Sequence, residues 1–367
     1  MEAARGHAKT MRLRIIFTAL LVLSASALQA ETAWRLKNYS APAEEGATAG
    51  PVLYQPLEKA SRPWQLCILY PHLKDSYWLS VNHGMVEEAK RLGVHFTLLE
   101  AGGYPNLARQ AGQVRTCAER GADALIIGTV SYDGLTPVLQ PLLQKMPVIA
   151  AINDIADAAV TAKALVPWRE MGAAAAQVIV SRHPRGSAPV DIAWFPGPEG
   201  AGWVHFVEEG FYAVIGESSA RVVAVKYGDT GREEQVQLIE ELLDQHPDID
   251  YLVGSGPMAE AAVSLLRARG IATGAIGIVS DYMTHAVHRG IRRGRILAAP
   301  SDFPVMQGRL AVEMAVRALE GSLKTASAGP AIEIVSKETI DHYGASDTLA
   351  PADFVPVFRW PLPGAQP

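Results

Sequence analysis

The stretch LARQAGQVRTCAERGADALIIGTV, residues 107–130, places a helix directly before a buried strand. Its first part is typical of a helix that ends at Gly121, because glycine readily adopts the left-handed conformation found where helices end. Its second part, ADALIIGTV, is almost wholly apolar, as expected for a parallel strand covered by helices on both faces. A helix followed by such a strand indicates α/β organisation.

The same alternation of apolar runs and amphipathic stretches extends along the chain from residue 64. Within residues 78–93, apolar side chains recur at spacings of three and four, which predicts a helix with one buried face. After residue 165 the alternation begins again, so that the sequence contains two βα successions of similar size. Besides the strand at 122–130, we expect strands at residues 64–70, 94–100, 147–153, 190–197, 248–255 and 275–281.

Two such successions predict an α/β protein of two doubly wound, Rossmann-like lobes with a ligand cleft between them. We assign residues 62–165, with a return at about 300–335, to the first lobe and residues 166–299 to the second. Residues 31–61 lack a clear period, and the end of the chain, residues 336–367, is rich in proline, which opposes a helix. We expect both ends to be extended arms on the surface.

Residues 11–30, MRLRIIFTALLVLSASALQA, have the order of features found in a secretory signal peptide. Arginines precede a short apolar run, and small residues follow it. The run is shorter than the ~20 residues needed to span a bilayer, so a retained anchor is the weaker interpretation. We therefore expect residues 1–30 to be removed and the mature protein to be exported to the periplasm and soluble.

The chain has two cysteines, Cys67 in a predicted strand and Cys117 in a predicted helix. An exported protein with two cysteines can form one disulfide, which would close a long loop and stabilise the fold by ~2–4 kcal/mol. We expect this bridge, with two buried free thiols as the alternative. Two cysteines are too few for a cysteine zinc site.

The motifs of common enzymes and nucleotide-binding proteins are missing from the sequence. The first predicted strand is followed by PHLKD, without the glycines that approach a pyrophosphate, and neither a Walker loop nor a G-x-S-x-G motif occurs. The ten histidines show no paired ligand spacing, and the net charge of −5 gives no indication of nucleic-acid binding. We expect no catalytic site, no metal site and no cofactor, and interpret the protein as a non-enzyme.

Aromatic side chains follow the predicted strands of both lobes, where ligands bind in open α/β sheets. Aromatic faces beside one carboxylate suit a methylated ammonium group, which cannot donate ordinary hydrogen bonds. Trp64, Trp194 and Trp203 are interpreted as packing or rim residues. The candidate ligand-binding residues are Asp75, Tyr77, Trp78, Tyr104, Trp168 and Tyr282.

Three segments resemble the type I periplasmic binding proteins of the ribose-binding class. They are AKRLGV at 89–94, CAERGADALIIGTV at 117–130 and QGRLAVEMAVRALEG at 307–321. Sugar-binding members commonly carry an Asp-Arg pair after the strand that ends here in Asn153 and Asp154. The arginine clamp on sugar hydroxyls is therefore missing from this chain.

Within that class, four further segments are similar to a periplasmic sensor of trimethylamine N-oxide. They are LCILYPHLKDSYWLSVNHGM at 66–85, LEAGGY at 99–104, VPWREMG at 166–172 and HRGIRRGRILAAPSD at 288–302. The resemblance implies that the six candidate residues line the ligand cleft, although Asp281 beside Tyr282 departs from the pattern.

The same resemblance implies that the partner is the periplasmic domain of a membrane histidine kinase that controls genes for respiration on trimethylamine N-oxide. The alternative within the class is the substrate-binding subunit of an importer for a sugar or a quaternary amine. A periplasmic enzyme would need a catalytic nucleophile or a metal site, and the sequence shows no group of residues that would form either. A cytoplasmic repressor is disfavoured by the signal peptide and by the lack of a DNA-binding module before residue 64.

Overall fold

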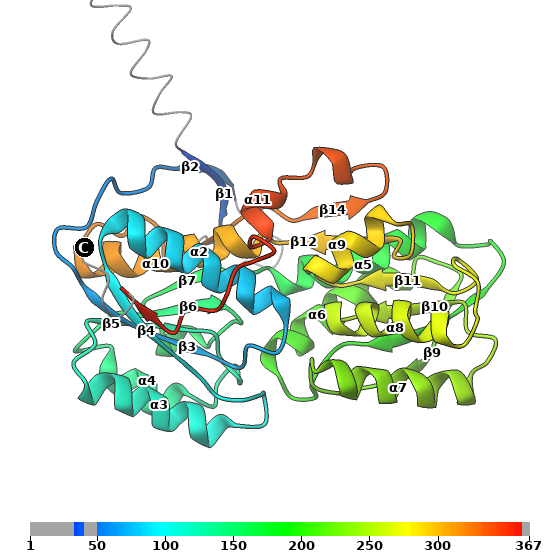
Figure 1. Ribbon diagram of the computed structural model, residues 1–367, viewed down its shortest axis with the longest axis horizontal. Helices are drawn as coiled ribbons and strands as arrows, with labels where there is room; N and C mark the ends of the chain where they lie inside the picture. Colours follow the sequence, from blue (N-terminus) through cyan, green and yellow to red (C-terminus); the bar gives the residue numbers. More distant parts are fainter. Residues whose placement is uncertain (1–32, 40–49, 362–367) are drawn as a thin grey trace, which may run out of the picture.

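Two β-sheets, each lying between helices, form the framework of the molecule (Figure 1). The computed structural model describes residues 33–39 and 50–361. The predicted signal peptide, residues 1–30, lies outside these described residues. The two sheets with their helices confirm the predicted α/β fold of two doubly wound lobes.

The first sheet has nine strands in the order β15-β4-β3-β5-β6-β7-β13-β1-β2. Its strands from β4 to β13 run parallel, and the pairs at its two edges are antiparallel. The strands are β1 Trp34–Asn38, β2 Pro51–Tyr54, β3 Gln65–Tyr70, β4 His95–Glu100, β5 Ala124–Ile127, β6 Val148–Ile152, β7 Ala162–Leu165, β13 Ser327–Gly329 and β15 Arg359–Trp360. The helices of this lobe are α2 Ser76–Leu92, α3 Leu107–Glu119, α4 Thr136–Leu139 and α10 Pro304–Leu319, with short 3₁₀ turns at Gln140–Leu142 and Asp157–Ala159.

The second sheet has six strands in the order β14-β12-β11-β10-β8-β9, of which β14 alone runs antiparallel to its neighbour. Its strands are β8 Val190–Phe195, β9 Ala220–Val225, β10 Tyr251–Gly254, β11 Gly277–Ser280, β12 Ala298–Ser301 and β14 Glu333–Ser336. Its helices are α5 Trp168–Arg182, α6 Gly202–Ile215, α7 Arg232–Gln245, α8 Gly256–Ala268, α9 His285–Arg292 and α11 Ala345–Thr348, with a 3₁₀ turn at Ile340–His342.

The two ends differ from the surface arms that we expected. The described part of residues 31–61 supplies β1 and β2 to the first sheet, and β15 near the C-terminus pairs with β4 at its other edge. Trp34 and Tyr54 stack on one another with ring centroids 5.7 Å apart, and both are buried. Together these three edge strands bury only Trp34, Leu36 and Tyr54, so they lack the continuous buried apolar run by which the parallel strands were recognised.

The chain passes between the two sheets four times within its described length, from β7 to β8, from β12 to β13, from β13 to β14 and from β14 to β15. Helix α10 packs on α2 of the first lobe, where we expected it, but β14 joins the second sheet. On the last pass the backbone of Val357 exchanges two hydrogen bonds with Asn82 of α2. The fourth pass is therefore held against the first lobe.

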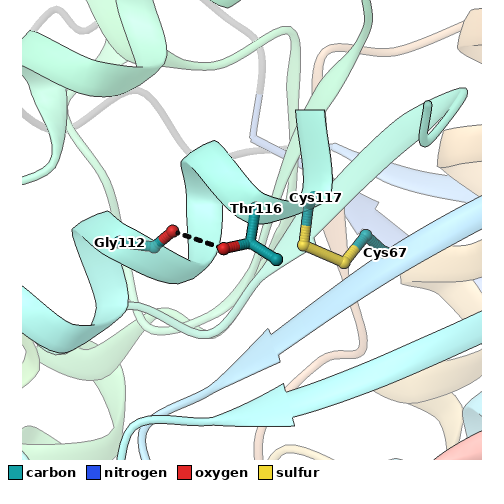
Figure 2. Close-up of a disulfide and its surroundings, with 4 residues drawn as sticks. All are labelled: Cys67, Gly112, Thr116 and Cys117. Carbon is teal, nitrogen blue, oxygen red and sulfur yellow. Dashed lines mark hydrogen bonds between the residues drawn. A yellow bond between two sulfur atoms is a disulfide. The ribbon is translucent and has the colours of Figure 1, made fainter. Parts of the chain in front are cut away.

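A disulfide joins Cys67 of β3 to Cys117 of α3 (Figure 2). The two Cα atoms are 6.0 Å apart, and both residues are buried among the apolar side chains between α3 and the sheet. Beside the bridge, Thr116 Oγ1 donates a hydrogen bond to the Gly112 carbonyl within the same helix. The bridge ties α3 to the strand that leads into α2.

Each lobe contains a pair of helices that cross at glycines. A Cβ atom at Gly84 of α2 would overlap the Val305 carbonyl of α10, and a Cβ at Gly308 would overlap the Val81 carbonyl in return. In the second lobe, a Cβ at Gly172 of α5 would overlap the backbone of α6. The close approach of these helices therefore requires the absence of a side chain.

We predict that Gly172→Ala lowers the free energy of unfolding by about 3 kcal/mol or more, because its methyl group would force α5 and α6 apart. Gly112→Ala, in α3, is the matched control, since the nearest atom to its Cβ would be 4.0 Å away. It should be neutral or stabilising by about 0.5–1 kcal/mol. Urea denaturation measures both changes, and equal effects of the two substitutions would contradict the prediction.

Candidate functional site

A small cavity lies between the lobes and is lined by residues that follow strands of both sheets. Its volume is about 20 Å³, enough for about one water molecule and far below the ~300–1,000 Å³ of sites for drug-sized ligands. The structure brings all six candidate residues together at this cavity. The lining residues are Asp75, Tyr77, Trp78, Tyr104, Ile152, Asn153, Trp168, Trp203, Thr230 and Tyr282.

Asp75 organises the entry to helix α2 and also contacts the second lobe. As the N-cap residue, it accepts a hydrogen bond from the Tyr77 backbone N–H at 2.9 Å. Its other carboxyl oxygen accepts a bond from the Tyr282 hydroxyl of the second lobe at 2.7 Å. This capping places Tyr77 and Trp78 in the first turn of α2, where both side chains reach the cavity.

A second tyrosine–carboxylate bond runs beside the first. The Tyr77 hydroxyl donates to Asp302 Oδ2 at 2.6 Å. Asp302 follows β12 of the second sheet and precedes α10 of the first lobe, so it lies in a segment that connects the lobes. Sequence reasoning did not select Asp302, although its place after a strand was a usable signal.

The aromatic rings form a continuous set of contacts across the cleft. Tyr77 of the first lobe meets Tyr282 of the second edge-on, with ring centroids 5.4 Å apart. Trp203 lies 4.9 Å from Trp168 and 6.2 Å from Tyr104 between ring centroids. Trp203 was interpreted as a packing or rim residue, whereas the structure places it in the cavity lining. Trp203 lies at the start of α6, after β8, and so beyond the carboxyl end of a strand, where ligands bind in open α/β sheets.

Hydrogen-bond donors in the cavity differ in their availability. Asn153 Nδ2 donates to the Tyr104 hydroxyl oxygen at 3.0 Å, which leaves the hydroxyl hydrogen of Tyr104 free for another acceptor. The Trp168 indole N–H is used, because it donates to the Ile152 carbonyl at 3.0 Å. The Trp203 indole N–H is buried and makes no hydrogen bond of ordinary geometry within the described residues, but it lies near the Tyr104 hydroxyl and opposes the rise in the pKa of that group.

The cavity has an acidic character. Burial raises the pKa of Asp75 to about 6, against the lowering effect of the bonds from Tyr77 and Tyr282. Burial likewise raises the pKa of Asp302 to about 6, against the lowering effect of the Tyr77 hydroxyl. Both carboxyl groups are mainly ionised at neutral pH, and the lining residues include no lysine or arginine. The arrangement suits a small cation with apolar substituents.

Metal binding and membrane crossing find no support in the part of the chain that the structure describes. No group of three or more His, Cys, Asp or Glu side chains there is placed to hold a metal ion. Among the described helices, none combines the length and the apolar character that a bilayer crossing requires.

Asp281, the residue before Tyr282, is fully buried, and neither of its carboxyl oxygens has a hydrogen-bond partner in the described structure. Burial raises the pKa of Asp281 well above its usual range, and the charge of Asp75 adds to the effect. Burial therefore favours the neutral form of Asp281 beside the cavity.

We predict that Asp281→Asn raises the Tm, and that the gain widens from pH 4 to pH 7. The pKa of Asp281 is higher in the folded protein than the ~3.9 of the unfolded chain. The contribution of Asp281 to stability is therefore full below the unfolded pKa and is lost as the pH rises from there towards the folded pKa. Scanning calorimetry measures the difference, which should reach a few degrees at pH 7. The same replacement at exposed Asp353 is the control, and a pH-independent difference for Asp281→Asn would refute the prediction.

Comparison with known families places residues 63–354 among the periplasmic binding proteins and sugar-binding domains of the LacI family. Periplasmic protein TorT of Escherichia coli K12 is 40% identical over 303 residues, which are 82% of this chain and 86% of TorT. The resemblance inferred from the sequence segments is thus confirmed.

Solved structures agree with this similarity. A complex of the TorS sensor domain and TorT in the presence of trimethylamine N-oxide matches with a TM-score of 0.73 and 38% identity, over 80% of this chain and 99% of the matched chain. An ABC transporter solute-binding protein from Bradyrhizobium sp. BTAi1, with bound bis-tris, matches with a TM-score of 0.75 and 44% identity, over 89% and 98% of the two chains. These matches confirm the fold of a type I periplasmic binding protein.

Proposed function

The chain belongs to the family of periplasmic binding proteins and sugar-binding domains of the LacI family, and from that premise we propose that it is a periplasmic sensor of trimethylamine N-oxide. The ligand would bind between the lobes, and its occupancy would be reported to the periplasmic domain of a membrane histidine kinase. The observation that carries the proposal is the cavity of aromatic rings from both lobes around Asp75.

The chemistry of the cavity fits the two ends of this ligand. The methyl groups on its positive nitrogen would lie against ring faces, each contributing ~0.5–2 kcal/mol. Asp75 would supply the opposite charge. The N-oxide oxygen needs donors, and the candidates are the Tyr104 hydroxyl and the neighbouring Trp203 indole N–H.

The size of the ligand sets an upper limit on its affinity. Trimethylamine N-oxide has five heavy atoms, and the best small ligands gain about −1.5 kcal/mol per atom. The dissociation constant would therefore not fall below roughly a few micromolar. The cavity of about 20 Å³ is smaller than this ligand, so binding would require the lobes or the lining side chains to move apart.

The partner and the location follow from the relatives. TorT is described as periplasmic, and its complex with the TorS sensor domain is solved both without ligand and with trimethylamine N-oxide. For this chain we propose the same compartment and a sensor kinase of the same kind. A binding role without catalysis agrees with relatives that are binding proteins.

A second candidate function is the solute-binding subunit of an importer. The Bradyrhizobium protein, an ABC transporter solute-binding protein, is 44% identical and holds bis-tris, which is a tertiary amine with hydroxyl groups. The same cavity would then deliver an amine to a transporter. The two functions differ in the partner and in the tolerance for larger amines.

Calorimetric titration of the mature protein tests the proposal directly. We expect saturable binding of trimethylamine N-oxide at micromolar concentrations, no binding of ribose, and co-purification with the periplasmic domain of a TorS-type kinase. Glycine betaine is the second control ligand. Binding of larger amines in place of the N-oxide, without kinase association, would favour the importer.

We further predict that Trp203→Phe weakens binding of trimethylamine N-oxide by about 10- to 100-fold, because a hydrogen bond to the charged oxygen is lost while a ring face remains. Tetramethylammonium, which lacks the oxygen, should bind the variant as it binds the wild type. Trp194→Phe is the matched control, since the Trp194 indole N–H is also buried without a partner within the described residues but lies outside the cavity. Unchanged N-oxide affinity in Trp203→Phe would show that the donor is another group.

A further inference from the structure

The lobes also contact one another beside the cavity, between the loop that follows β3 and the loop that follows β9. His72 Nε2 lies 2.9 Å from Thr230 Oγ1, and Lys74 Nζ lies 3.3 Å from Asp229 Oδ2. His72 and Lys74 belong to the first lobe, whereas Asp229 and Thr230 belong to the second. These bonds therefore exist only while the lobes are close together.

The protonation state of His72 is set by its surroundings. The Lys74 backbone N–H donates to His72 Nδ1 at 3.3 Å, so the proton of the neutral ring is on Nε2. Nε2–H then donates to the Thr230 hydroxyl oxygen. Burial lowers the pKa of His72 to about 4, although Asp229 opposes the shift, and the ring is neutral at pH 7. His72 is thus a neutral donor that is only 1% exposed.

Both partners of the His72–Thr230 bond lie next to the ligand cavity. The His72 ring lies edge-on against Tyr104, with centroids 5.5 Å apart, and Thr230 itself lines the cavity. The loop of Thr230 is held in place, because its backbone N–H donates to Asp229 Oδ1 at 2.8 Å and Gln235 Nε2 donates to the Asp229 carbonyl at 2.9 Å. Movement of this loop away from the first lobe would open the cavity beside Tyr104.

We propose that His72 and Thr230 are positioning residues that latch the two lobes together and thereby retain the ligand in the cavity. The inference deepens the proposed function, on which its ligand measurement rests. The neighbouring ion pair adds less, because half of the Lys74 side chain is exposed and exposed ion pairs contribute little. The buried histidine–threonine bond is the principal element of the latch.

The latch acts on retention of the ligand rather than on its recognition. A ligand bound between two lobes leaves only when they separate, so a weaker closed state raises the dissociation rate. Neither His72 nor Thr230 needs to touch the ligand for this effect. A purely structural role would instead lower the Tm without a matching change in the dissociation rate.

The test uses the mature protein and the substitution Thr230→Val, which keeps the shape of the side chain and removes its hydroxyl. We expect trimethylamine N-oxide to dissociate about 10-fold faster, as followed by stopped-flow tryptophan fluorescence, and the ligand-free protein to have a larger radius of gyration by X-ray scattering. Thr230→Ser, which keeps the hydroxyl, should recover most of both effects. Thr116→Val in α3 is the matched control for the same substitution away from the cavity.

A double-mutant cycle separates the latch from other effects of the substitutions. His72→Phe keeps a ring against Tyr104 but lacks the Nε2–H donor, so it should resemble Thr230→Val, and the double variant should be no worse than either single one. Equal dissociation rates and equal radii for Thr230→Val and Thr230→Ser would overturn the inference. If the wild type does not bind the N-oxide, the proposed function fails, and the radii of the ligand-free variants still decide on the latch.

Discussion

The burial of one carboxyl group, that of Asp75, is the constraint on which the rest of the site depends. Its two oxygens serve different parts of the molecule, since one caps α2 and the other accepts the Tyr282 hydroxyl of the opposite lobe. A buried carboxylate is costly unless it is hydrogen-bonded, so closing the lobes provides a partner that the open form would have to replace with water. The same carboxylate gives the cavity its charge. Helix geometry, lobe closure and ligand preference are thereby linked through a single side chain.

Much of the fold could be predicted from the sequence because parallel strands covered on both faces are continuous apolar runs. The edge strands β1, β2 and β15 could not, since they are antiparallel and together bury only Trp34, Leu36 and Tyr54. Their pairing partners are distant in the sequence, and only the folded sheet shows which edge is vacant for them.

Five of the six candidate residues could be found because they follow predicted strands, and Trp168 because it stands where the second βα succession begins. The structure places all six on one cavity. Trp203 also follows a predicted strand but stands in the glycine-rich run GPEGAGW, whose simplest interpretation is a loop. Asp302, although it also follows a strand, and His72 could not be assigned a role from the sequence for a different reason. Their roles depend on partners in the other lobe, Tyr77 being 225 residues from Asp302 and Thr230 158 residues from His72, and only the relative placement of the lobes supplies those partners.

The four passes of the chain between the sheets restrict how the lobes can move. Two bodies joined by one flexible segment can twist, slide and bend, whereas bodies joined by several short segments keep few degrees of freedom and tend to rotate about a common hinge. The fourth pass, held to α2 by Val357 and Asn82, adds to that restriction. Opening of the lobes would then be mainly a rotation about one hinge axis. A partner that contacts both lobes needs to read only the angle of that rotation, and it can do so without approaching the ligand.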